Sequence, residues 1–420
     1  MEEASTGNRP KRPFDKLEWV GRALVGHPDP HSVSFGASTP PGFRTLETFT
    51  AVPSASRPYL LIPMGSRRLA AEAIYQLTNA PRKSVRLAKS LLALGMRAGI
   101  AQHLLRDRLD LSMDADASMD GLVVREYLRE VFGTRVGAAV LLGADRPNRK
   151  PVLQVLTTDG QVLGYAKVGW NDVSRNLVRT EARVLETLAE PRNRPSTFKV
   201  PRLLHVGRCG NLEVIVVAPV PREPWYRRGA PVSLPVAATR EVSARSLVEH
   251  TALVETRYWS ALRDRVASPL DHGAATGIRE ALTEVMDLVA DRMGGTVLAT
   301  GSWHGDWTPW NMSLTGGELY IWDWERSGED TPLGIDVAHF VFLVLVKIRK
   351  LSPQAAVRRS IELCRDLFPK IGVPAAHVRV VTSLHLLEMC TRYEEARASG
   401  MELLDPIYLS ALRSSVQDLA

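Results

Sequence analysis

Four polar residues in the most aromatic part of the chain have types and spacings suited to acid–base and metal chemistry. His304, Asp306 and Asn311 fit the pattern H-x-D-x-x-x-x-N, and Asp323 follows twelve residues after Asn311. A carboxylate such as that of Asp306 can take a proton from a hydroxyl group. The oxygens of an amide and of a second carboxylate are ligands that the hard cation Mg²⁺ prefers. The pattern therefore predicts a base at Asp306 beside a magnesium ion held by Asn311 and Asp323.

A polar turn in a buried hairpin is the competing explanation for the same residues. Residues 301–325 contain five of the nine tryptophans of the chain. Trp322 and Trp324 alternate with Asp323, so strand periodicity turns both away from the metal side and favours the core for them. Trp307 and Trp310 lie in the loop and either pack beneath it or line a pocket. The polar pattern should arise by chance on the order of once in a thousand chains of this length, which favours the functional explanation.

The H-x-D-x-x-x-x-N spacing is typical of kinase-type catalytic loops. Phosphoryl transfer with such a loop also needs a lysine from an upstream strand and a glutamate from the following helix. Lys167 lies in the strand-like run "GYAKVGW", and Glu181 follows in the helical run "VRTEARVLETL". An exposed edge strand and a solvated helix face are the alternative environments for these two side chains. Their order and element types favour an ion pair between Lys167 and Glu181 at the phosphates of a nucleotide.

From about Arg135 to Glu388 the chain resembles the aminoglycoside phosphotransferase and choline kinase superfamily, which consists of small-molecule kinases with a protein-kinase-like fold. Lys167 carries this resemblance together with the sequences "RTEARVLETL", "VIVVAPVP", "HGDWTPWN", "IWDWE" and "GIDVAHF". The resemblance implies that ATP or GTP donates a phosphate, with Mg²⁺ as cofactor, to a hydroxyl group of an antibiotic, sugar or related metabolite.

The resemblance also implies a role for each matching residue. Asp306 corresponds to the catalytic base, and His304 braces the loop that carries it. Lys167 holds the nucleotide phosphates with Glu181 as its partner. The remaining matches are Asn311 and Asp323 as magnesium ligands, Asp336 as an acid that stabilises the loop through hydrogen bonds, and Glu325 as a recurrent acid of less defined role.

Three departures from the family pattern affect the nucleotide site and the acceptor. The sequence "GADRPNRK" replaces a glycine-rich loop, so we expect Arg149, with its neighbours Arg146 and Asn148 or backbone amides, to cover the phosphates. Because prolines lack an N–H group, an adenine hydrogen bond at the hinge must come from Ala218 or Val220. Thr308 stands where serine/threonine protein kinases usually have a lysine, which favours a small-molecule acceptor over a protein.

The wider pattern predicts an α+β fold of the bilobal protein-kinase type with an N-terminal helical extension. Residues 1–130 form that extension, irregular up to residue 56, helical and basic over 67–108, and followed by an acidic linker. Residues 131–221 form a β-rich N-lobe with one helix at 172–190. Residues 222–420 form a C-lobe with the catalytic loop at 304–311, the metal site at 323 and a hairpin turned at "TGGE". Its helices are expected at 238–264, 275–292, 335–350, 353–367 and 374–398.

Composition narrows the class of protein. The longest apolar run, "FVFLVLV", is too short to span a membrane, and the three scattered cysteines suggest no disulfide framework, so we expect a cytoplasmic protein. The net charge of +7 favours anionic partners. Nucleic acid is not favoured, because the basic segment 57–108 lacks an aromatic stacking pattern.

The alternative to an enzyme is a nucleotide-binding pseudokinase whose basic N-terminal region binds an anionic partner, although every catalytic position is filled.

Overall fold

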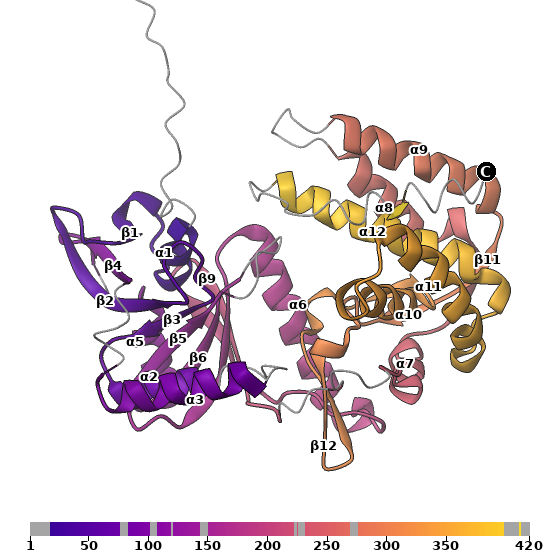
Figure 1. Cartoon of the computed structure of the whole chain (residues 1–420). Helices are drawn as coiled ribbons and strands as arrows, with labels where there is room; N and C mark the ends of the chain where they lie inside the picture. Colours follow the sequence, from indigo (N-terminus) through magenta and orange to yellow (C-terminus); the bar gives the residue numbers. More distant parts are fainter. Residues whose placement is uncertain are drawn as a thin grey trace, which may run out of the picture. The chain divides into compact units, whose positions relative to one another are not determined.

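The chain folds as two units, each with its own hydrophobic core (Figure 1). The computed structural model describes residues 17–75, 83–100, 107–118, 121–142, 150–221, 225, 232–268, 276–398 and 411–412. The first unit comprises the described residues up to 142 together with 150–178 and 203–219. The second comprises 179–202 and the described residues from 220 onward.

An antiparallel sheet of nine strands, in the order β1-β4-β2-β3-β5-β6-β7-β9-β8, forms the first unit. Each face of the sheet has its own buried cluster of side chains. Because side chains alternate between the faces of a strand, neighbouring residues of β3 belong to different clusters. In β3, Leu61 joins the core cluster that contains residues of α1 and α5, whereas Leu60 and Ile62 join the cluster that contains residues of α2 and α3. The central strands are therefore buried on both sides.

The elements of the first unit have the following bounds. The helices are α1 (Glu18–Leu24), α2 (Arg67–Tyr75), α3 (Lys83–Arg97), α5 (Val124–Phe132) and α6 (Asp172–Ala189), the last of which continues into the second unit. The strands are β1 (Val33–Gly36), β2 (Phe43–Val52), β3 (Leu60–Pro63), β4 (Arg108–Asp114), β5 (Val136–Leu141), β6 (Val152–Thr157), β7 (Val162–Gly169), β8 (Leu203–Cys209) and β9 (Leu212–Val217).

The N-terminal part of this unit differs from the sequence-based expectation. The segment expected to be irregular up to residue 56 contains β1 and the long strand β2, and the expected acidic linker begins with β4. Leu109, Leu111 and Met113 alternate along β4 and are all buried. Asp110, Asp114 and Asp116 gave this segment the composition of a linker, although its period of two is that of a strand. The N-terminal strands thus extend the β-rich sheet, whereas α2 and α3 match the expected basic helical stretch.

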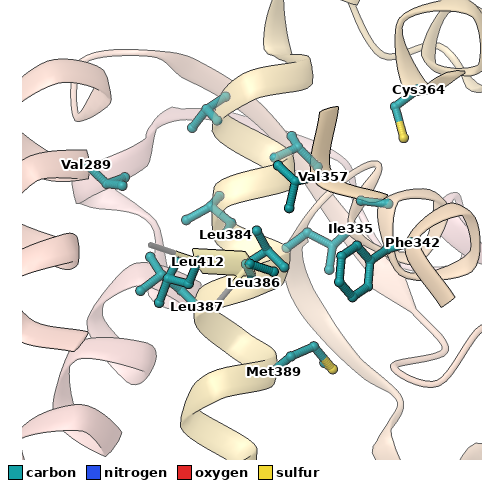
Figure 2. Close-up of a cluster of buried hydrophobic side chains, with 14 of the residues drawn as sticks. Val289, Ile335, Phe342, Val357, Cys364, Leu384, Leu386, Leu387, Met389 and Leu412 are labelled. Atoms are coloured by element: carbon teal, nitrogen blue, oxygen red, sulfur yellow. The ribbon is translucent and has the colours of Figure 1, made fainter. Parts of the chain in front are cut away.

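A core of packed helices forms the second unit. In Figure 2, Leu386 of α12 lies toward Ile335 and Phe342 of α10, whereas Leu387 lies on the other side of α12, and all four side chains belong to one buried cluster. The site described below lies on segments that rest against this core.

The elements of the second unit have the following bounds. The helices are α7 (Val236–Ser243), α8 (Arg257–Ala267), α9 (Thr276–Met293), α10 (Ile335–Leu343), α11 (Pro353–Leu367) and α12 (Val378–Ala398), and α10 runs into a π-helical turn, Val344–Ile348. The strands are β10 (Glu249–Ala252), β11 (Val297–Trp303), β12 (Met312–Thr315), β13 (Glu318–Ile321) and β14 (Gly328–Pro332).

Two features of this unit concern the predicted elements. The expected hairpin is present as β12 and β13, turned at Gly316 and Gly317, which both have positive φ angles as a tight two-residue turn requires. The prediction of a single helix over 238–264 is wrong, because β10 separates α7 from α8 in this segment. This strand pairs with β11 in a small sheet of the order β10-β11-β14, a pairing of segments about 50 residues apart that local periodicity does not reveal.

No helix among the described residues is long and apolar enough to cross a membrane.

Candidate active site

The loop of residues 304–311 connects β11 to β12, and Gly305 determines its path. Gly305 has a φ angle of +81°, a conformation that residues with a Cβ atom rarely adopt. A Cβ atom at this position would also lie 2.2 Å from the carbonyl oxygen of Arg326. Only glycine therefore allows the loop to pass this closely to the segment that follows Asp323.

His304 and Asp336 hold the start of the loop. Oδ2 of Asp336 accepts a hydrogen bond of 2.7 Å from the backbone N–H of His304, and Oδ1 accepts one of 3.1 Å from that of Gly305. Nδ1 of His304 accepts from the backbone N–H of Asp306 at 3.2 Å, which leaves Nε2 to donate to the carbonyl oxygen of Trp322 at 3.1 Å. The buried imidazole thus ties the loop to the end of the hairpin.

The environment of these two residues favours their roles as hydrogen-bonding braces. Burial lowers the pKa of His304 against the opposing charges of nearby aspartates, so the ring is neutral near pH 7. Burial also raises the pKa of Asp336, while its contacts with His304 and Gly305 oppose that rise. The ring of His304 packs edge-on against that of Trp307, which is buried. Trp307 therefore lies beneath the loop.

Asp306 is held through both of its carboxylate oxygens. His339 donates from Nε2 to Oδ1 at 3.1 Å, and Asn311 donates from Nδ2 to Oδ2 at 2.9 Å. Burial raises the pKa of Asp306, but the hydrogen bond from His339 and the nearby imidazoles together outweigh burial, so the pKa is lowered. One quarter of the Asp306 side chain remains exposed, so an ionised carboxylate is accessible to a small molecule.

Asp323 lies two residues after the end of β13, in a cluster of three carboxylates. Its φ angle of +71° puts it in the left-handed region, which aspartate tolerates better than most residues. Carboxylate oxygens of Glu181, Asp323 and Glu325 all lie within 4.8 Å of one another. The backbone N–H of Trp322 donates to the carbonyl oxygen of Asn311, so Asn311 stands beside the start of this cluster.

The donor set at Asp323 fits a hard divalent cation. Such a cation binds carboxylate and amide oxygens, and three carboxylates are grouped here. Nδ2 of Asn311 is engaged by Asp306, which leaves Oδ1 as the atom of this amide that can ligate a metal. The acidic group includes Glu181 and Glu325, which sequence analysis had not assigned to the metal.

The residues predicted to bind the nucleotide occupy separate elements. Lys167 is buried in β7 between β6 and β9, so it is not the edge-strand lysine of the alternative explanation. Glu181 is buried in α6, so it does not lie on a solvated helix face. Ala218 and Val220 follow β9 and are partly exposed. Arg149 lies outside the described residues, as do Arg146 and Asn148. Lys167 and Glu181 belong to different units, and their pairing stays a prediction.

Arg392 of α12 holds the loop from a helix near the end of the described chain. Its Nη1 donates to the carbonyl oxygen of Gly305 at 2.7 Å, and its Nε donates to Glu388 at 2.6 Å. The guanidinium group also lies 4.8 Å from the centroid of the Trp303 ring, within the range of a cation–π contact. The backbone next to Asp306 is therefore fixed by a charged side chain.

Glu388 and Arg265 complete this charged network. Arg265 of α8 donates to both carboxylate oxygens of Glu388 and also binds Glu395 through a pair of hydrogen bonds. Burial raises the pKa of Glu388, but Arg392 and Arg265 outweigh burial and lower it to about 2. The carboxylate is thus ionised and fully compensated by arginines.

Sequence analysis had not assigned His339, Arg392 or Arg265 to the site. The position of His339 in "GIDVAHF", three residues after Asp336, offered one signal, since residues at this spacing share a helix face. Arg392 and Arg265 reach the site from distant helices and carry no local signal.

Comparisons with known proteins give structural matches only. No protein-family model and no curated protein sequence matches the chain. A crystal structure of aminoglycoside phosphotransferase APH(4)-Ia is similar at a TM-score of 0.47 and 12% identity, covering 70% of this chain and 97% of that chain. Choline kinase LicA from Streptococcus pneumoniae matches at 0.41 and 15%, with coverages of 70% and 97%. A fructosamine-3-kinase homologue from Haemophilus somnus 129PT matches at 0.40 and 12%, with coverages of 71% and 97%.

The structures named above are those of small-molecule kinases. The expected α+β class is confirmed by the chain's own nine-stranded antiparallel sheet and its separate helical unit. The case for a function rests on the residues of the site.

Proposed function

We propose that the protein is a small-molecule kinase that transfers the γ-phosphate of ATP or GTP to a hydroxyl group. The observation that supports this most is the arrangement around Asp306. An ionised, partly exposed carboxylate is fixed through both oxygens, one of them by the side chain of Asn311. The backbone of Asn311 is hydrogen-bonded to Trp322, the residue before Asp323 of the carboxylate cluster. A base next to a site for a hard cation is what phosphoryl transfer to a hydroxyl requires.

Each residue has a defined task in this reaction. Asp306 accepts the proton of the acceptor hydroxyl while the new O–P bond forms and the bond to the leaving nucleoside diphosphate breaks. Asn311 and Asp323, with Glu181 or Glu325, would hold Mg²⁺, which would supply positive charge to the phosphate oxygens. Lys167 binds the phosphates of the nucleotide. His304 and Asp336 keep the loop in place.

The charges near Asp306 favour an acceptor that is not polycationic. Glu388 and Glu395 are ion-paired with arginines, so these carboxylates are not available to bind amino groups of an acceptor. Arg326 makes no ion pair within the described part of the chain, and burial and the charge of Arg392 lower its pKa to about 10. A neutral or anionic hydroxyl compound, such as a sugar or a related metabolite, matches this environment better than an aminoglycoside.

An acceptor screen tests the proposal. Wild-type protein with Mg²⁺ and ATP or GTP is incubated with sugars, aminosugars, macrolides, aminoglycosides and choline-like alcohols, and nucleoside diphosphate formation is measured. Asp306→Ala and Asp323→Ala should each abolish the acceptor-dependent rate. Asp330→Ala is the matched control, because Asp330 is an acid of the same unit that pairs with the exposed Arg257, and it should retain the full rate.

A flat result would favour the alternative. If wild type, Asp306→Ala and Asp323→Ala all show the same background with every acceptor, the protein is not acting as a kinase. Nucleotide binding without turnover would then support the alternative of a nucleotide-binding pseudokinase.

A further inference from the structure

Helix α10 directs two polar side chains onto the same loop. Asp336 and His339 are three residues apart, so they lie on one face of the helix, about one turn from each other. Asp336 binds the backbone N–H groups of His304 and Gly305, while His339 reaches the side chain of Asp306. One helix therefore controls both the path of the loop and the orientation of the carboxylate that we propose as the base.

The hydrogen bond defines the tautomer of His339. An ionised carboxylate can only accept hydrogen bonds, so Nε2 of His339 must carry a proton. Nδ1 is buried and has no hydrogen-bond partner among the described residues. The proton on Nε2 therefore has Asp306 as its hydrogen-bond partner. Asp306 is thus the polar group that fixes the state of this imidazole.

The surroundings of His339 contain titratable groups on three sides. Asp306 lies on the loop, Asp336 lies on the same helix, and His385 of α12 packs edge-on against the ring with centroids 5.2 Å apart. His385 is fully buried, and neither of its ring nitrogens has a hydrogen-bond partner among the described residues. His385 therefore serves as packing, in contrast to its neighbour.

We propose that His339 is a positioning residue for proton transfer to Asp306, an inference that rests on the proposed kinase function. With one donor on each oxygen, His339 and Asn311 fix the plane of the Asp306 carboxylate. Without the imidazole, the carboxylate can rotate about the bond to its Cβ atom and turn its lone pairs away from the acceptor. A small misplacement of this kind can cost about 100-fold in rate.

Three variants separate positioning from packing. His339→Leu removes the donor and keeps a similar volume. His339→Gln places an amide N–H near the position of Nε2 and should restore the hydrogen bond. His385→Leu is the matched control, because it changes the neighbouring buried histidine without removing a donor to Asp306.

The readout is single-turnover hydrolysis of MgATP with water as the acceptor, together with the KM for ATP. His339→Leu should lower the rate constant roughly 10- to 100-fold with the KM for ATP unchanged, whereas His339→Gln and His385→Leu should stay within about threefold of wild type by the same argument. Equal rates for His339→Leu and wild type would overturn the proposal, as would a glutamine variant as slow as the leucine variant.

A spectroscopic measurement keeps this inference distinct from the function. Long-range ¹H–¹⁵N spectra of histidine-labelled protein should show a proton on Nε2 of His339, and Asp306→Ala should change the His339 signal. An Nε2 without a proton, or no response of the His339 signal to Asp306→Ala, would contradict the inference. If wild type shows no turnover that depends on Asp306 and Asp323, that result counts against the proposed kinase function. The NMR signal of His339 would then test the contact between His339 and Asp306 by itself.

Discussion

The guanidinium group of Arg392 donates a hydrogen bond of 2.7 Å to the carbonyl oxygen of Gly305, across 87 residues of sequence. This contact joins α12 to the loop that carries Asp306. Because Arg392 also neutralises the buried Glu388, the position of the loop and the stability of the helical unit depend on the same side chain.

Replacing Arg392 with Met should therefore destabilise the protein. The change leaves a buried carboxylate with one arginine fewer, and breaking such a pair typically costs about 3–5 kcal/mol. Urea unfolding measures this loss. Arg359→Met, which breaks an exposed pair with Glu362, should cost less than about 1 kcal/mol. Equal losses for the two variants would show that the buried network contributes no more than a surface pair.

Gly305→Ala should reduce both stability and turnover. The left-handed backbone alone costs about 1–2 kcal/mol for a residue with a Cβ atom, and the contact with the carbonyl oxygen of Arg326 adds to this. Gly42→Ala separates the two effects, since Gly42 has a φ angle of +79° with nothing within 4 Å of its Cβ position. Thermal and urea unfolding should show a clearly larger loss for Gly305→Ala. A loss no larger than that of Gly42→Ala would mean that the loop shifts freely away from Arg326.

The pH dependence of stability should carry a contribution from Glu388. Its folded pKa of about 2 lies below the ordinary value of 4.5, so the unfolded state binds more protons between these values. The contribution is complete above pH 4.5 and is lost as the pH falls toward 2. Urea unfolding of wild type and Glu388→Gln between pH 6 and 3 should show a stability difference that shrinks on acidification. A difference that stays constant would contradict the low pKa.

Metal binding should depend on the carboxylate cluster. Mn²⁺ bound in the presence of ADP can be followed by electron paramagnetic resonance. Asp323→Asn should abolish this binding, and Glu181→Gln should weaken it by about 10-fold, because Glu181 lies within 4.8 Å of the other two acids. Asp330→Asn, outside the cluster, is the control. Undiminished Mn²⁺ binding by Asp323→Asn would remove Asp323 from the proposed ligand set.

The polar motif was predictable because its parts are close in sequence. His304, Asp306, Asn311 and Asp323 lie within 20 residues, and the hairpin between the last two is encoded by Gly316 and Gly317. The strand of Lys167 and the helix of Glu181 were also apparent from periodicity. Local patterns of this kind report directly on local structure.

The contacts that support the motif depend on tertiary packing. Arg392, Arg265 and His339 reach the loop from three helices, and no local pattern specifies which helix faces lie against it. Strand β4 was missed for a different reason, since Asp110 and Asp114 masked the alternation of its buried residues, which include Leu109 and Leu111. Strand β10 forms where β11 offers a partner, which a helical periodicity over the surrounding residues concealed.

The transfer of ³²P from γ-labelled ATP to a hydroxyl acceptor in the presence of Mg²⁺, by wild type and by the nearly isosteric variant Asp306→Asn, tests the central claim most directly. The amide preserves the shape of the side chain but cannot take a proton, so the variant should transfer label at least about 100-fold more slowly, and chelation of Mg²⁺ should stop transfer by the wild type. Equal transfer by wild type and Asp306→Asn, or transfer that persists without a divalent cation, would contradict a kinase site built on Asp306 and Asp323.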